Sequence, residues 1–165
     1  MASNIPIVKQ IAWIYLIPQV IFMGLILLVY HFLVFREPVL WCVLTYLAIS
    51  FLIRKMLAKY HQQGMKLVKQ QKFENAISLF IKSVDFFAKH QWIDKYRFLT
   101  LLSASKMTYK EMALCNIAFC YSQIGNGTKA KEYYEQTLEE FPKNGLAIAA
   151  LKMINLFEGK AQEEI

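Results

Sequence analysis

The sequence predicts an all-α protein in which a membrane-embedded pair of helices precedes a stack of helical hairpins. Two stretches, 11–35 and 39–53, contain no Asp, Glu, Lys or Arg, as expected of helices in lipid. The stretch 111–144 carries apolar residues at steps of three or four on both sides of a glycine-containing break, which is typical of two amphipathic helices. Hydrophobic residues make up 56% of the chain, and their excess in the first third fits a membrane segment.

The first uncharged stretch is long enough to span a bilayer. A helix rises 1.5 Å per residue, so residues 11–35 can cross a hydrocarbon core of about 30 Å. A cleaved signal peptide is not expected, because the apolar run is too long and no small-residue cleavage site follows it. Gln19 and His31 are the polar groups in or near this span. We expect them to pair helices or anchor the interface rather than to line a transport path.

The second uncharged stretch, 39–53, follows a short polar turn and is brief for a span. The side chains of Arg54, Lys55 and Lys59 can extend its usable length by reaching toward the headgroups. We therefore predict a two-helix transmembrane anchor over 1–56. The alternative is one full span followed by a membrane-embedded half-helix. The second span is expected to continue without a break into the next helix, with a hinge between 58 and 64 as the alternative.

Basic residues predict the orientation of the anchor. Residues 54–72 contain six Lys or Arg and no acid, whereas Arg36 in the turn between the spans is balanced by Glu37. By the positive-inside rule, the N-terminus and everything after the second span face the cytoplasm. The same basic residues predict contact with anionic lipid headgroups. The candidates are Arg54, Lys55, Lys59 and Lys66.

The hairpin at 111–144 has recognisable ends. Thr108 and Glu111 have the spacing of a capping box that starts its first helix, and Pro142 ends its second. Its length and pattern resemble a tetratricopeptide repeat (TPR), a 34-residue helix–turn–helix unit of α-solenoids. The positions that carry the resemblance are Leu114, Ile117, Ala118, Tyr121, Gly125, Ala130, Tyr134 and Pro142. Thr137 departs from it, because the family prefers alanine there.

The resemblance implies further repeats, because one hairpin cannot bury its own apolar face. The same frame fits 57–90, with Gly64 at the small position where the two helices approach. A TPR-like domain over 57–160 is therefore expected, with repeats at 57–90 and 111–144 and a capping helix at 145–158. The insertion 91–110 is expected to lengthen the preceding helix. It could instead lie on the membrane surface with Lys95 and Arg97 facing phosphates, or bind a partner.

The sequence predicts no catalytic chemistry. It contains no P-loop, dinucleotide fingerprint, nucleophile elbow or zinc-protease motif, and its three histidines are far apart. The three cysteines lack framework or metal-ligand spacing, which indicates reduced thiols in an intracellular compartment. The net charge of +7 is concentrated after the second span. Because no basic groove interleaved with aromatic residues is visible, we expect no nucleic-acid site. We therefore expect no enzyme activity, no cofactor and no metal.

The resemblance implies a partner-binding groove formed by the first helix of each hairpin. The groove positions are His61, Met65, Val68, Met112, Cys115, Asn116, Phe119 and Ser122. Four of the five positions at which some relatives clamp a C-terminal carboxylate are occupied by unsuitable residues, so no such clamp is expected. A groove rich in Met and Phe suits an apolar or helical peptide.

Two functions fit these features. The first is a membrane-anchored protein-interaction adaptor or assembly factor that presents a TPR groove to the cytoplasm. The alternative is a structural accessory subunit of a larger membrane complex. A third function class is a small transporter or channel component. The spans also allow self-association through Gln19.

Overall fold

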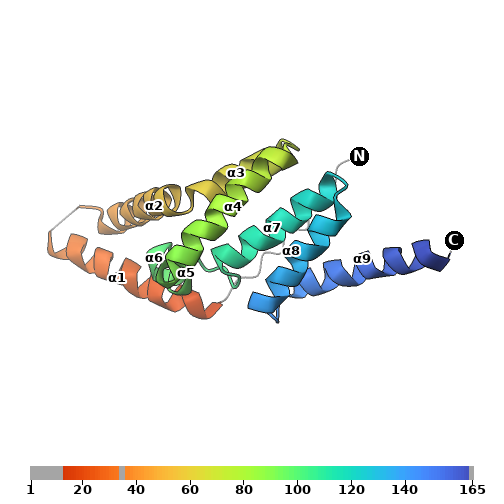
Figure 1. Ribbon diagram of the computed structural model, residues 1–165. Coiled ribbons are helices and arrows are strands. Elements are labelled where there is room, and N and C mark those ends of the chain that lie inside the picture. The colour runs from red at the N-terminus through yellow and green to blue at the C-terminus, as the bar shows by residue number, and fades with distance from the viewer. Residues whose placement is uncertain (1–12, 34–35, 164–165) are drawn as a thin grey trace. The chain divides into compact units, whose positions relative to one another are not determined.

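The computed structural model describes residues 13–33 and 36–163 (Figure 1). Within these ranges every regular element is a helix, which confirms the predicted all-α class. The described chain divides into two compact units. The first unit contains the described residues up to Lys59 together with 90–108, and the second contains 60–89 and the residues from Tyr109 onward. The segment predicted as an insertion into the second domain thus belongs almost entirely to the first unit.

Two long helices dominate the first unit. The helices of this unit are η1 (Trp13–Tyr15), α1 (Leu16–Phe32), α2 (Pro38–Leu57), α5 (Gln91–Lys95) and α6 (Arg97–Thr100). Pro18 lies in the first turn of α1 and Pro38 is the first residue of α2, positions where the missing N–H group of proline would have no helical partner. Helix α2 begins before the second uncharged stretch, 39–53, and ends after it. It has 20 residues and is about 30 Å long.

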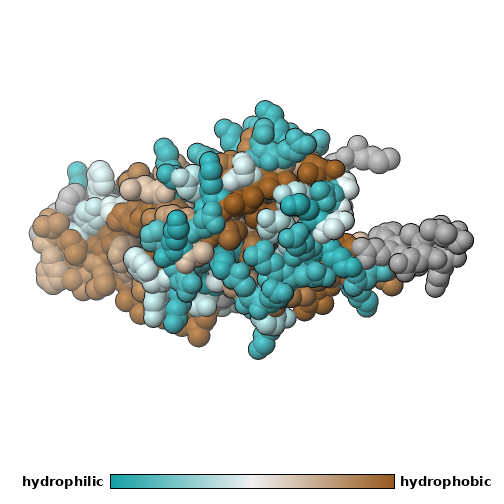
Figure 2. Space-filling view, in the orientation of Figure 1, coloured by the Kyte–Doolittle hydropathy of each residue, from teal (hydrophilic) through white to brown (hydrophobic). Residues whose placement is uncertain are grey.

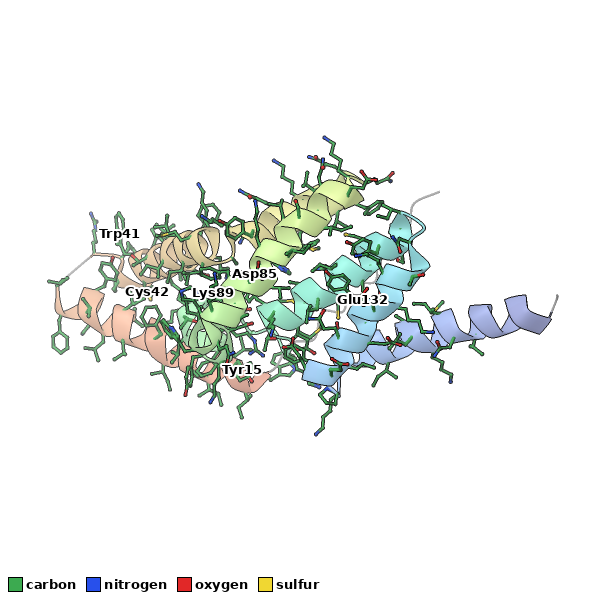
Figure 3. All side chains as sticks on the ribbon, in the orientation of Figure 1. Tyr15, Trp41, Cys42, Asp85, Lys89 and Glu132 are labelled. Carbon is green, nitrogen blue, oxygen red and sulfur yellow. The ribbon has the colours of Figure 1, made fainter. Side chains whose placement is uncertain are left out.

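Polar bonds join α1 to α2. The Tyr30 and Thr45 hydroxyls are 2.7 Å apart, and the Tyr46 hydroxyl donates to Gln19 Oε1 at 3.3 Å. The Cys42 thiol donates to the Met23 carbonyl at 3.2 Å, and Figure 3 shows Cys42 on the side of α2 that faces α1. Such bonds hold helices together where water is absent, so Gln19 has the helix-pairing contact expected from the sequence.

The outer surfaces of these helices are apolar and open. Two helices, Trp13–Phe32 and Pro38–Leu57, are long and apolar enough to cross a membrane, and only 6% and 11% of their apolar windows are buried. The core helix of a soluble protein would bury most of that surface. Figure 2 shows the corresponding hydrophobic surface in brown over α1 and α2.

The helix expected to continue from the second span is interrupted. The N–H group of Ala58 donates to the Arg54 carbonyl at 3.0 Å and ends α2. The next helix begins at Lys59. The continuous helix predicted from the sequence is therefore wrong, and the break lies at the start of the alternative hinge region, 58–64.

Five helices belong to the second unit. They are α3 (Lys59–Lys69, from Tyr60 on), α4 (Phe73–Lys89), α7 (Tyr109–Gln123), α8 (Gly127–Glu140) and α9 (Gly145–Glu163). In chain order, α4 contacts α7, α7 contacts α8, and α8 contacts α9. Gly64 brings α3 against α4, since a Cβ atom at Gly64 would meet the Phe80 ring at 2.7–2.9 Å.

The core of the second unit lies between these helices. Phe80, Phe87, Leu114 and Ile117 are almost completely buried. A further cluster is centred on Ala118, Tyr134 and Ala147, where the C-terminal helix covers α8. Thr137 is buried as well, and its hydroxyl donates to the Tyr133 carbonyl at 2.7 Å. That bond satisfies the hydroxyl, so threonine is accommodated at a position where alanine was expected.

Candidate functional site

The predicted groove residues fall on α3 and α7 of the second unit, and the structure separates them into buried and accessible sets. His61, Val68 and Cys115 are buried. The accessible set consists of Met65, Met112, Asn116, Phe119 and Ser122. We call this accessible set the α3–α7 face. Three of the eight predicted groove residues thus contribute to packing, and five remain on the surface of the unit.

The α3–α7 face combines thioether, aromatic and amide groups. Met112, Asn116 and Phe119 are spaced by four and three residues, so they share one side of α7. The Asn116 amide donates to Met65 Sδ at 3.4 Å, which ties α7 to α3. The Phe119 ring meets the edge of the Phe73 ring at 6.1 Å. The side chains of Met112, Asn116 and Phe119 are half-buried, so part of the apolar surface of Met112 and Phe119 remains accessible.

His61 is held between aromatic rings. It lies edge-on to Phe80 and Tyr109, at centroid distances of 5.6 and 5.3 Å. Its Nδ1 atom is buried without a hydrogen-bond partner. Burial lowers the pKa of His61 to about 4, because the charged form loses hydration that the rings do not replace. At neutral pH His61 is therefore an uncharged packing residue.

The thiols of α7 are also packing groups. Burial raises the pKa of Cys115 to about 12, as it does for Cys120. The buried side chain of Asn144 donates to Cys115 Sγ at 3.4 Å. Thiols with such a high pKa are almost entirely protonated and react slowly.

The predicted lipid-contact residues are divided between the two units. Arg54, Lys55 and Lys59 belong to the first unit and Lys66 to the second. Lys55, Lys59 and Lys66 are exposed, and the Lys55 ammonium lies 5.9 Å from the centre of the Phe51 ring. These three exposed lysines remain candidates for headgroup contact.

Arg54 has an intramolecular role that the sequence did not reveal. Its guanidinium donates to the Leu101 carbonyl at 3.0 Å and also to the Leu102 carbonyl. Leu102 has a positive φ of 47°, a conformation that costs about 1 kcal/mol or more for a residue with a side chain. Arg54 thus fastens segment 90–108 to the end of α2. A local pattern could not show this, because the partners are far apart in sequence.

Arg97 is the second arginine that organises this segment. It is 4% exposed, and its guanidinium donates to the carbonyls of Ser105, Asp94 and Lys106. The guanidinium carbon lies 5.2 Å from the centre of the Tyr15 ring. Tyr15 lies immediately before α1, as Figure 3 shows. Arg97 therefore points into the unit, whereas one sequence-based alternative had it facing lipid phosphates.

The segment 90–108 is not an extension of α4. That helix ends at Lys89, and α5 and α6 follow as two short helices. The elongated helix favoured by the sequence is therefore wrong. Within the first unit α6 contacts α1, and the rings of Phe98 and Tyr15 stack at 5.2 Å.

Three comparisons with known proteins add no relative. No family model, no curated protein and no solved structure matches this chain.

Proposed function

We propose that the protein is a membrane-anchored adaptor that holds a protein partner on a TPR-like unit. The observation that carries the proposal is the α3–α7 face, where half-buried Met and Phe side chains lie on either side of Asn116. Flexible thioethers beside an aromatic ring fit the apolar side of a helical peptide. The amide can position that peptide through hydrogen bonds.

The order of helix contacts in the second unit supports the TPR-like assignment. Each helix from α4 onward contacts the next one of the unit along the chain, as expected of a stacked array. Gly64 and Ala118, the residues expected at close helix approach, are both buried. The C-terminal helix covers the second hairpin through Ala147 and its neighbours.

Membrane anchoring is supported by the open apolar surfaces of α1 and α2 and by their paired polar contacts. The basic residues after the second span favour a cytoplasmic second unit. This orientation leaves the exposed sequon at Asn126 unmodified. Insertion of the chain into microsomes tests it, and a glycan on Asn126 would contradict it.

A photo-crosslinking residue at Met112 tests the binding proposal in native membranes. We expect one adduct of defined mass, which disappears when Phe119 is also changed to Lys. The matched control carries the crosslinker at Glu132, which is exposed on α8 (Figure 3). Equal adducts at both positions, or none at Met112, would contradict the proposal.

The second candidate function is a structural accessory subunit. It is favoured by α9, which packs on α8 through one side and leaves Ile148, Met153 and Leu156 about half exposed on the other. A permanent partner would cover that apolar surface. Changing Met153 and Leu156 to Lys separates the two functions, because the subunit then loses its partner and the adaptor, which binds through the α3–α7 face, retains it.

A further inference from the structure

Three exposed side chains form an apolar stripe on segment 90–108. Trp92, Tyr96 and Leu99 lie one helical turn apart and are 61%, 46% and 50% exposed. The helical register continues through the short break, since the Tyr96 N–H group donates to the Trp92 carbonyl and the Leu99 N–H group to the Tyr96 carbonyl. The stripe is therefore a single surface across α5 and α6.

The stripe is fixed beside the ends of the two long apolar helices. Phe98, between Tyr96 and Leu99, stacks on Tyr15 at the start of α1. Arg54, near the end of α2, binds the carbonyls that follow α6. Both contacts lie within the first unit. In an antiparallel hairpin these two helix ends meet the same face of a bilayer.

The charges of this segment are arranged for an interface between water and lipid. The guanidinium of Arg97 is satisfied internally by three carbonyls, so it leaves the outer surface apolar. Lys95 is exposed, with its ammonium 5.7 Å from the Tyr96 ring centre. Trp and Tyr concentrate at the headgroup level of membranes, and a neighbouring lysine can reach anionic phosphates.

We propose that α5 and α6 form an interfacial anchor whose Trp92, Tyr96 and Leu99 side chains enter the headgroup region of the bilayer that holds α1 and α2. The inference rests on the proposed membrane insertion of those two helices. It gives segment 90–108 a lipid surface as its partner. The segment then attaches the chain to the bilayer surface beside the start of α1 and the end of α2, in addition to the attachment that the two helices provide.

Single-tryptophan variants of the full chain test the proposal in vesicles that contain no other protein. The chain has three tryptophans, so Trp13→Phe with Trp41→Phe leaves Trp92 alone, and Trp13→Phe with Trp92→Phe leaves Trp41 alone. The vesicles contain lipid brominated on the acyl chain close to the headgroup. We expect the Trp92 fluorescence to lose at least as large a fraction as the Trp41 fluorescence. Tyr96→Ser with Leu99→Ser should reduce the loss at Trp92 and leave that at Trp41 unchanged.

The two readouts distinguish the possible failures. Quenching of Trp41 without quenching of Trp92 overturns the interfacial anchor, leaves the spans in the bilayer and assigns the stripe to a protein partner. Absence of quenching at both tryptophans overturns the membrane insertion on which the inference rests. Quenching of Trp92 that the Tyr96→Ser and Leu99→Ser changes do not alter also overturns the role of the stripe.

Discussion

The side chain of Asn144 connects the C-terminal helix to α7. Its Oδ1 atom accepts from the Ala147 N–H group at 2.8 Å and caps α9, while its Nδ2 atom donates to Glu111 Oε1 at 2.9 Å. Asn144 is 4% exposed. We expect Asn144→Ala to lower the free energy of unfolding by about 1–3 kcal/mol, because it removes a cap and leaves buried groups unpaired. Urea unfolding of the second unit, followed by circular dichroism in detergent, measures the change.

Asn126 provides the matched control for that experiment. Its Oδ1 atom caps α8 by accepting from the Lys129 N–H group at 3.0 Å, but the residue is exposed. Water can replace the bond, so Asn126→Ala should lower the free energy of unfolding by about 1 kcal/mol or less. An equal loss at both positions would show that the burial of Asn144 adds nothing to its cap.

His61 makes the stability of the second unit depend on pH. Its pKa is about 4 in the folded protein and about 6.5 in an unfolded chain. Between these values the unfolded chain binds more protons, so the free energy of unfolding falls as the pH falls from 6.5 to 4. The full loss is about 3 kcal/mol. Thermal melts across this range should show a steeper decline for the native chain than for His61→Leu, and parallel curves would contradict the assignment.

At the same scale, the sequence predicted some side chains better than others. Gly64 and Ala118 were expected at close helix approaches, because only small residues fit there, and both are buried. His61, Val68 and Cys115 were expected on a groove and are buried instead. Periodicity shows which residues share one side of α7, but both α4 and α8 contact that helix. Whether these neighbours bury a given residue depends on tertiary packing, which the local sequence does not encode.

Among the elements, α3 depends on the absence of a side chain at Gly64. A Cβ atom there would meet the ring of Phe80, which is fully buried. Gly64→Ala should therefore lower the free energy of unfolding by about 1–3 kcal/mol, even though alanine favours helix by about 1 kcal/mol. Gly127 has no atom within 4 Å of such a Cβ, so Gly127→Ala should be neutral or stabilising. Chemical unfolding of the two variants in detergent compares them directly.

Segment 90–108 depends on Arg54. Arg54→Lys keeps the positive charge but cannot reproduce the two-carbonyl contact of the guanidinium. We expect faster tryptic cleavage after Lys106, which is exposed at the end of this segment. Lys55→Gln is the control, since the Lys55 ammonium lies over the Phe51 ring rather than on the segment. Cleavage of both variants at the native rate would show that Arg54 does not hold the segment.

Helix positions were largely predictable from local sequence, whereas the route of segment 90–108 was not. The apolar spacing located helices α3, α4, α7 and α8, and the proline after α8 marked the end of that helix, because these signals act within a few residues. The two short helices after Lys89 replace a predicted helix extension. They are positioned by Arg54 and Tyr15, partners more than forty residues distant in the chain. The apolar spacing within the segment cannot predict contacts with such distant partners.

The proposed orientation of the whole molecule predicts two different patterns of thiol labelling. Glu37→Cys, between the spans, should react with an impermeant maleimide from outside sealed right-side-out vesicles. Glu135→Cys, exposed on α8, should react only after the vesicles are opened. The native chain is a suitable blank, because Cys42, Cys115 and Cys120 are buried. The reverse pattern would place the second unit on the other side of the membrane.

The first unit is built from two separate parts of the chain, and this determines when it can form during synthesis. Its later part, 90–108, leaves the ribosome only after the α3–α4 hairpin of the other unit has been made. Arg54 therefore lacks its carbonyl partners until this later part has been made. A nascent chain stopped at Lys89 would contain α1 and α2 and lack the segment that Arg54 binds.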